Sequence, residues 1–539
     1  MTEVKISPFW FSVGICSSLV MPSCRHKAEM PKRPNIIFIM ADDHAYQAIS
    51  AYNSKLIQTP GIDRLAREGM LFTNACVTNS ISAPSRAVIL TGKHSHINGK
   101  IDNRSPFDTT QVTFPQLMQA QGYQTAMFGK LHFGNTPKGF DDYMILPGQG
   151  DYYNPEFITP AGKVQIEGYA TDIITDLTIN WLEKKRDKNK PFLLFCWHKA
   201  PHREWLPAER HFREFIHRQF PEPPTLFDNY EGRGTAAREA EMNILKHMNW
   251  AGDSKVYPSV MDQLGIKETS SWDKKALENH LNRMTAAQRK AWDEVYGPMN
   301  EELKKKYPSM TLKEKMQWRY QRYMQDYLAC IAAVDESVAR ILQYLDEHHL
   351  DENTLVIYTS DQGFYLGEHG WFDKRFIYNE SFKTPLLIRW PGVISPGSKC
   401  DEMVQNLDLA PTLLEAAQIP VPSDMQGESL LPLFRGQTDA WKRDAVYYHY
   451  YEYPAVHMVK RHYGIVTREY KLVHFYYDVD EWELYDRIKD SLELKNVYND
   501  PAYAGVVKKL KEQLKQLRAK YGDSEQLDSL FIVKYQQEK

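Results

Sequence analysis

The chain has 539 residues, 42% of them hydrophobic and 25% charged, which is typical of a folded protein and excludes wholesale disorder. Its 66 basic and 69 acidic side chains nearly balance, and a formal net charge of -3 argues against a general nucleic-acid binder. We therefore expect no nucleic-acid partner, and any anion must meet a local site.

The N-terminal segment has the pattern of an export signal. An apolar stretch from Phe9 to Met21 follows Lys5, and Cys24 comes next, directly after small residues. The stretch is too short for a good transmembrane helix, and a cysteine in this place is typical of a bacterial lipoprotein. We predict a signal peptide over residues 1–24 and a periplasmic or surface-anchored lipoprotein, attached to the membrane only through lipidated Cys24. Simple secretion is the alternative.

The segment 32–435 is predicted to form a large α/β domain. Helical patterns around residues 62–68 and 114–121 alternate with apolar runs at 125–128 and 192–197. Alternation of this kind is typical of a mainly parallel sheet flanked by helices.

Two further regions stand apart from that pattern. Residues 203–311 are rich in charge, Trp and Pro and lack strand alternation, so we interpret them as an insertion packed beside the site, leading into a long helix over about 312–345. Residues 440–539 are predicted to form a smaller C-terminal α+β subdomain. Its expected elements are strands near 445–450, 463–467 and 470–475 and a helix over about 502–520.

Acidic side chains follow two predicted strands of the large domain. The first apolar run stops before Asp42 and Asp43, and the later run 354–359 stops before Asp361 and Gln362. Ligands bind beyond the carboxyl ends of parallel strands, so we expect these side chains to meet at one edge of the sheet. Paired Asp residues at such a place can also be only a turn or a helix cap.

The sharpest motif is the segment Ser82–Arg86, which continues to Gly92. It matches the sulfatase signature Cys/Ser-x-Pro-Ser-Arg-x-x-x-Leu-Thr-Gly at every fixed position, although the residues alone could form a proline-started helix with a Ser cap. The resemblance implies an alkaline-phosphatase-like fold. It also implies that a maturation enzyme oxidises Ser82 to formylglycine, whose hydrated aldehyde attacks sulfur. Serine here resembles the versions matured by serine-type enzymes of anaerobic bacteria, which favours a native serine over an engineered replacement of cysteine.

The same resemblance implies a calcium site. Carboxylate and amide oxygens are the ligands that Ca2+ prefers, and the acids after the two strands supply them. Gln362 stands where the family more usually has Asn or His, a change that keeps a carbonyl ligand. The implied ligands are Asp42, Asp43, Ser82, Asp361 and Gln362.

Roles for the remaining site residues are carried over motif by motif. Lys130 and Lys374 are implied to bind sulfate, His132 to act as base on the diol, and His202 to protonate the leaving sugar oxygen. Arg86 is implied to hold the diol and the metal-site carboxylates. An isolated His or Lys in a loop is more often a surface residue, but these segments occur in the family's order along the chain.

Two longer phrases, Thr359–Trp371 and His198–Arg203, resemble the bacterial N-acetylglucosamine-6-sulfatases that desulfate mucin or heparan-type glycans. The implied substrate is a sulfated saccharide with a 6-O-sulfate on N-acetylglucosamine or N-sulfoglucosamine. His369 and His457 are the predicted contacts to the sugar, with a hydrated subdomain surface as the alternative.

Three other functions stay open at this point. One is a sulfatase with another sugar or linkage preference. Another is a phosphomonoesterase or phosphonate hydrolase of the same superfamily, which the intact Ser82 signature disfavours because such an enzyme does not need it. The last is an inactive surface lipoprotein that only binds sulfated glycans, as would follow if Ser82 were never oxidised.

Overall fold

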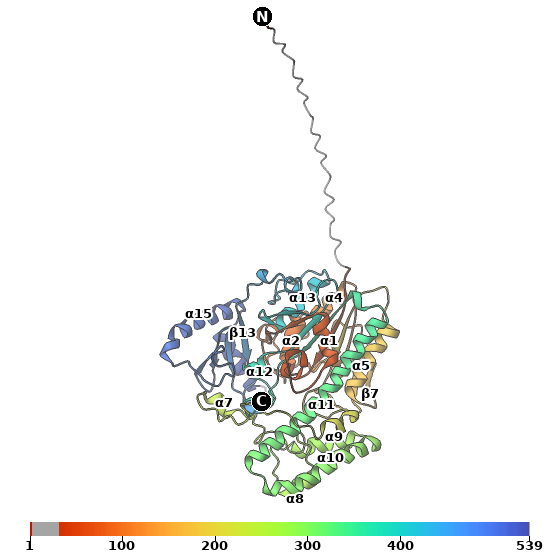
Figure 1. The fold of residues 1–539 in the computed structure, drawn as a ribbon, viewed down its shortest axis with the longest axis vertical. Coiled ribbons are helices and arrows are strands. Elements are labelled where there is room, and N and C mark those ends of the chain that lie inside the picture. The colour runs from red at the N-terminus through yellow and green to blue at the C-terminus, as the bar shows by residue number, and fades with distance from the viewer. Residues whose placement is uncertain (3–31, 538–539) are drawn as a thin grey trace. The chain divides into compact units, whose positions relative to one another are not determined.

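A ten-stranded sheet lies at the centre of the unit that begins at Arg33 (Figure 1). The computed structural model describes residues 1–2 and 32–537. Across the sheet the order is β11 (Ser398–Cys400), β2 (Met70–Phe72), β10 (Leu386–Arg389), β9 (Thr354–Ser360), β1 (Asn35–Ala41), β8 (Phe192–Trp197), β4 (Gln124–Lys130), β5 (Asp142–Leu146), β6 (Glu156–Thr159) and β7 (Gly162–Gln165).

The predicted signal peptide and Cys24 lie outside the described residues, apart from the first two positions of the chain, so export stays a prediction. In the part of the chain that is described, no helix has the length and apolar character needed to cross a membrane.

The middle of the sheet is parallel, which confirms the predicted fold class. Strands β9, β1, β8, β4 and β5 pair in parallel, with Ile36 in register with Leu193 on one side and Leu355 on the other. Strand β10 is antiparallel to both β9 and β2, and β6 and β7 add an antiparallel edge. These short strands were not predicted, because three or four residues carry too little periodicity to be recognised.

Both faces of the sheet are covered by helices. Along β1, Ile37 and Ile39 face one hydrophobic core while Ile36, Phe38 and Met40 face the other, and all five are fully buried. Successive strand side chains point to opposite faces, so a continuous apolar run is what a doubly covered strand requires. Helices α1 (Pro60–Glu68), α5 (Ala170–Asn180) and α11 (Leu312–Glu347) pack into the first core, and α2 (Ser82–Thr91), α4 (Phe114–Ala120) and α13 (Leu409–Ala416) into the second.

The long helix α11 begins at a capping box. Thr311 Oγ1 accepts a hydrogen bond from the Glu314 backbone N–H, and the Glu314 carboxylate accepts one from the Thr311 N–H. In residues 203–311 the regular elements are helical, and α8, α9 and α10 group around one end of α11 (Figure 1). The helices of this segment are α6 (Phe212–Phe215), α7 (Thr235–Glu239), α8 (Pro258–Leu264), α9 (Asp273–Arg283) and α10 (Ala286–Lys306).

A separate antiparallel sheet forms near the C-terminus, as the fold prediction required. One of its faces packs on helix α15 (Ala504–Lys520), and the other packs on Ile81 and Phe382 beside helix α2. Its strands, in spatial order, are β13 (Ala445–Tyr450), β14 (His462–Thr467), β15 (Tyr470–Phe475) and β16 (Glu481–Asp486). The sequence did not reveal β16 or the last helix, α16 (Glu525–Gln537).

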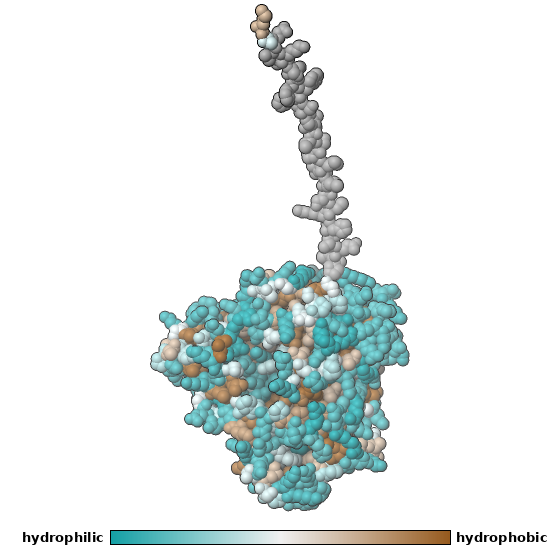
Figure 2. Space-filling model, in the orientation of Figure 1, coloured by the Kyte–Doolittle hydropathy of each residue, from teal (hydrophilic) through white to brown (hydrophobic). Residues whose placement is uncertain are grey.

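Short elements complete the fold. They are β3 (Ala75–Cys76), β12 (Val404–Gln405), α3 (Ser95–Asn98), α12 (Asn379–Phe382) and α14 (Leu431–Phe434). Hydrophilic side chains cover most of the face that Figure 2 shows. The boundaries of the large domain (32–435), its insertion and the subdomain (440–539) stay predictions, because residues from Arg33 onward form one compact unit that is not divided further.

Candidate active site

The carboxyl ends of β1 and β9 deliver their acidic side chains to one point, as expected of neighbouring parallel strands. The Asp43 backbone N–H donates to Asp361 Oδ1 over 3.1 Å, and Gln362 Nε2 donates to Asp43 Oδ1. Asp43 has a φ of 66°, and Tyr327 of α11 fixes this turn because its hydroxyl donates to the Asp43 carbonyl over 2.7 Å. Asp42, Asp43, Asp361 and Gln362 are all fully buried.

Helix α2 places the signature residues against this cluster. Ser82 is the first residue of α2, and its hydroxyl donates to Asp42 Oδ1 over 3.1 Å. One turn later, Arg86 donates from Nε to Asp361 Oδ2 over 3.1 Å and from its guanidinium to the Lys130 carbonyl. The Arg86 guanidinium also lies 5.3 Å from the centre of the Trp197 ring, a cation–π contact that adds to its hydrogen bonds.

Two buried ammonium groups contact the paired aspartates. Lys130, the last residue of β4, donates to Asp42 Oδ2 and to Gln149 Oε1. Lys374 Nζ lies 2.6 Å and 2.7 Å from the two carboxylate oxygens of Asp43. Both lysines are at most 3% exposed, so each ammonium depends on these oxygens for its hydrogen bonds.

Burial and mutual repulsion raise the pKa of two of the three carboxyls. Despite the Lys374 ammonium, burial and the charges of Asp42 and Asp361 raise the pKa of Asp43 to about 8. Burial and the Asp42 charge raise the pKa of Asp361 to about 6. For Asp42 burial is outweighed by Lys130 together with the other nearby cations, including Arg86 and Lys374, and its pKa is held well below the usual range. Crowded buried carboxyls of this kind are stabilised in their charged form by a divalent cation.

The donor set fits a hard cation such as Ca2+. Gln362 Oε1 is buried and has no hydrogen-bond partner in the described chain, so it is a free amide oxygen at the centre of the cluster. The carboxylates of Asp42, Asp43 and Asp361 and the Ser82 hydroxyl supply the other oxygens. Three carboxylates already face three cationic side chains here, so a divalent cation makes the centre positive and suited to an anion.

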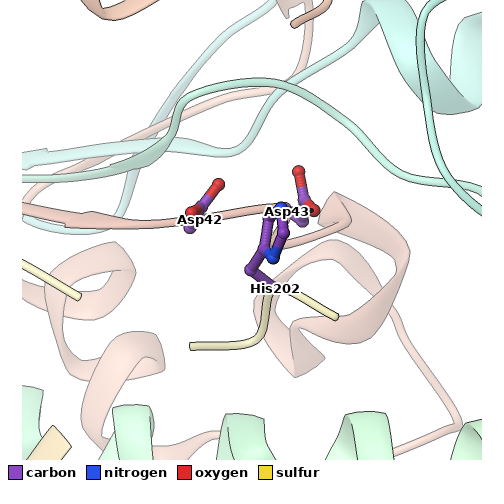
Figure 3. Close-up of side chains that lie close together, drawn as sticks. All are labelled: Asp42, Asp43 and His202. Carbon is purple, nitrogen blue, oxygen red and sulfur yellow. Dashed lines mark ion pairs between the residues drawn. The ribbon is translucent and has the colours of Figure 1, made fainter. Parts of the chain in front are cut away.

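Two histidines stand at the edge of the cluster. His202 Nε2 lies 3.8 Å from Asp43 Oδ2, and Figure 3 shows its imidazole beside the Asp42 and Asp43 carboxylates. His132 follows β4 with a φ of 66°, and its Nδ1 is buried without a hydrogen-bond partner. Burial, and next to it the charge of Lys130, hold the pKa of both histidines well below its usual range. Each imidazole is therefore neutral at pH 7 in this arrangement and able to accept a proton.

The two predicted sugar contacts lie in different surroundings. His457 Nε2 is 3.3 Å from Asp373 Oδ2 and 3.3 Å from a guanidinium nitrogen of Arg203, the residue after His202. His457 therefore stands in the shell around the cluster, since Asp373 precedes Lys374. His369 is 1% exposed and contacts none of the predicted metal ligands in the described structure. Both sugar-binding roles stay predictions.

His369 lies in a buried cluster of charged side chains, two of which, Asp228 and Arg233, come from the insertion. Its Nδ1 lies 3.2 Å from Asp228 Oδ2 and 2.9 Å from the Arg233 guanidinium, and its Nε2 lies 3.7 Å from Glu380. Although burial opposes the charged form, Asp228 and Glu380 raise the pKa of His369 to about 9. The imidazolium thus joins the insertion to the segment before helix α12.

Replacing His369 with glutamine is expected to cost about 3 kcal/mol of folding free energy at pH 6, since one pKa unit corresponds to about 1.36 kcal/mol. The folded pKa is raised, so this stability is complete below about pH 6.5 and disappears as the pH rises through about 9. Urea denaturation of both proteins at pH 6, 8 and 9.5 should show the gap closing.

His474→Gln is the matched control, because its partner Asp480 is largely exposed, and it should cost less than about 1 kcal/mol. A His369→Gln deficit that stays constant with pH would show that packing, and not charge, explains it.

Sequence reasoning missed several side chains that hold the site. Gln149 accepts from Lys130, and Asp253 of the insertion pairs with Arg203 over 2.5 Å. The Tyr448 hydroxyl links the C-terminal sheet to the site, since it accepts from the Ser80 N–H and donates to the Arg375 carbonyl. None of them lies in a recognisable motif. Arg203, the partner of Asp253, is the last residue of the His198–Arg203 phrase, but no role was predicted for it.

Two family models match the chain. One, described as Sulfatase, covers residues 34–419, and the other, described as N-sulphoglucosamine sulphohydrolase, C-terminal, covers residues 367–520. The N-acetylglucosamine-6-O-sulfatase of Bacteroides thetaiotaomicron is 48% identical over 94% of this chain and 90% of its own length.

Solved structures agree with these matches. A protein in complex with its substrate, D-glucosamine-2-N,6-O-disulfate, has a TM-score of 0.87 and 48% identity, covering 92% of this chain and 99% of its own. The phosphonate monoester hydrolase of Agrobacterium radiobacter has a TM-score of 0.65 and 22% identity over 91% of this chain and 96% of its own. At that identity the likeness shows a common fold alone.

Proposed function

The chain belongs to the sulfatase family and is a sulfuric ester hydrolase, and we propose that it removes the 6-O-sulfate from N-acetylglucosamine or N-sulfoglucosamine in a glycan. One observation carries this proposal. Lys130 donates to Asp42 and Lys374 donates to Asp43, and the Ser82 hydroxyl donates to Asp42. Two ammonium groups and the predicted nucleophile therefore lie at the same pair of aspartates. Such a constellation suits a tetrahedral oxyanion at residue 82.

The proposal includes calcium and a matured residue 82. The oxygens of Asp42, Asp43, Asp361, Gln362 and residue 82 would hold Ca2+, and a serine-type maturation enzyme would oxidise Ser82 to formylglycine. When present, the ion supplies Lewis acidity and formylglycine supplies a hydroxyl that attacks sulfur. Burial of the whole set excludes water that would otherwise compete for the reacting centre.

The side chains around residue 82 divide the remaining work. Lys130 and Lys374 bind the sulfate oxygens and balance the charge that develops on them. Arg86 holds Asp361 and the end of β4 in place, which keeps Lys130 aimed at the sulfate. The neutral His132 accepts a proton from residue 82 as inorganic sulfate leaves.

His202 is the proposed proton donor to the sugar oxygen. Its pKa is held low by burial and by Lys130, so it must gain a proton before it can donate one. A bound sulfate ester supplies a negative charge beside the imidazole and engages both lysines, and both effects favour the protonated form. The acid is thereby charged in the substrate complex rather than in the free protein.

The test is sulfate release by protein coexpressed with a serine-type maturation enzyme. Mass spectrometry should show the loss of about two hydrogens at Ser82, as oxidation of an alcohol to an aldehyde requires. We expect release from 6-O-sulfated N-acetylglucosamine or N-sulfoglucosamine and far slower hydrolysis of a phosphonate monoester. If the oxidised protein is inert on both sugars, the proposed substrate is wrong, while membership of the sulfatase family is unaffected.

A further inference from the structure

A cleft lies between helix α9 and two chain segments, around Asp151 and Glu204, that also carry residues next to the candidate active site. Its volume is about 510 Å³, within the roughly 300–1,000 Å³ of small-molecule sites. Trp272, directly before α9, and Ala276, Asn279, His280, Asn282 and Arg283 on the helix line one wall, and the facing wall holds Asp151, Gln165 and Glu204.

Two residues of the facing wall lie close along the chain to residues of the candidate active site. Glu204 comes two residues after His202, which lies 3.8 Å from Asp43. Asp151 comes two residues after Gln149, which accepts a hydrogen bond from Lys130. Two separate segments of the chain therefore border both the cleft and the surroundings of the candidate active site.

Helix α9 presents a polar face with one aromatic ring to the cleft. Positions 272, 276, 279 and 283 follow the helical spacing, so their side chains share one face. Trp272 is 50% exposed, and the amides of Asn279 and Asn282 are exposed without hydrogen-bond partners in the described chain. The helix start is rigid, because buried Asp273 accepts from the Trp250 and Ala251 N–H groups over 3.0 Å and 2.7 Å.

The charges in the cleft are already paired with one another. His280 Nε2 lies 2.6 Å from Glu204 Oε2, and Arg283 lies 2.9 Å from Asp151 Oδ2. Although burial opposes it, the contact with His280 lowers the pKa of Glu204 to about 2, so this carboxylate is ionised at neutral pH. A ligand here meets no unpaired cation, which favours an uncharged molecule over an anionic one.

We propose that this cleft is a subsite for an uncharged sugar unit joined to the sulfated one, stacked on Trp272 and hydrogen-bonded by Asn279 and Asn282. A flat indole with one exposed face and freely oriented amides is the chemistry that recognises a neutral pyranose ring. The subsite rests on the proposed function, since it binds the unit that follows the sulfated sugar. It disfavours a uronate in that position, because Arg283, which could otherwise bind its carboxylate, is already paired with Asp151.

Three substrates test the subsite: 6-O-sulfated N-acetylglucosamine alone, the same sugar joined to galactose, and the same sugar joined to glucuronate. We expect kcat/KM to be highest for the galactose disaccharide. Trp272→Ala should lower the disaccharide-to-monosaccharide ratio of kcat/KM about tenfold, a loss of about 1.4 kcal/mol in binding, and Trp272→Phe should restore most of it. Phe227→Ala, at an aromatic ring that is 46% exposed elsewhere in the insertion, should leave the ratio unchanged.

Isothermal calorimetry in a Ser82→Ala background separates this proposal from the proposed function, because binding is then read without turnover. Tighter binding of the galactose disaccharide that is lost with Trp272→Ala supports the subsite even if the sugar is not desulfated. Equal affinity for the three ligands, or a ratio that Trp272→Ala does not change, overturns the subsite while sulfate release from the monosaccharide leaves the proposed function intact.

Discussion

Replacing Ser82 with alanine is expected to reduce sulfate release by at least about 10⁴-fold, to the level of the uncatalysed reaction plus whatever binding alone supplies. The side chain is 1% exposed and makes one hydrogen bond, to Asp42, so its loss leaves the fold intact. Alanine also removes the group that maturation would oxidise. The check is the initial rate of sulfate release, with thermal denaturation of both proteins alongside.

Ser80→Ala is the matched control for this experiment. Ser80 is equally buried, two residues before Ser82, but its hydroxyl bonds to Ser381 and not to the carboxylate cluster. Its loss should cost about 1–3 kcal/mol of stability and leave the rate per folded molecule unchanged. If Ser80→Ala abolished activity and Ser82→Ala did not, the nucleophile would have to be sought elsewhere.

The parts of the fold that the sequence predicted are those with strong local signals. The apolar runs at β8 and β9 were placed to within one residue of their observed limits, and the end of β1 was placed directly before Asp42. The short strand β10 lies between β9 and β2. It has only four residues, too few to show a periodic pattern. Its place is set by pairing with β9 and β2, which a single segment does not encode.

The site divides in the same way. Asp42, Asp43, Ser82, Lys130 and Lys374 occur in motifs. In the structure Ser82 and Lys130 contact Asp42, and Lys374 contacts Asp43. The sequence could not predict the environment of His369, because its partners Asp228 and Arg233 lie far away along the chain in the insertion. Long-range pairs of this kind depend on how the insertion packs, and no local spacing reports that.

Asp43→Asn is expected to weaken calcium binding by more than about 100-fold, since the loss of an outer-shell partner alone costs 10–100-fold. Asn keeps the shape of the side chain but removes the charge that pairs with Lys374 and that Ca2+ would share. Sulfate release should fall with it, as it should when calcium is removed from the unchanged protein by a chelator. Asp335→Asn is the control: this buried carboxyl accepts from the Gly61 and Ile62 N–H groups, away from the cluster, and should affect stability alone.

The pH dependence of calcium binding gives the same site a sharper test. In the folded protein the pKa is raised to about 8 for Asp43 and about 6 for Asp361, against about 3.9 in an unfolded chain. The native state therefore holds more protons than the unfolded one in this range, so the calcium-free protein should lose stability as the pH rises from about 4 to 8.

Calcium reverses that trend, because the ion binds the ionised carboxylates and competes with their protons. Its stabilisation, measured as the shift in thermal midpoint at fixed calcium, should grow through the same window and level off above about pH 8. In Asp43→Asn only the step near pH 6 should remain, because Asp361 still titrates there. A calcium shift that is flat between pH 5 and 8 would mean that these carboxylates are not the ligands, and that Lys130 and Lys374 neutralise them permanently.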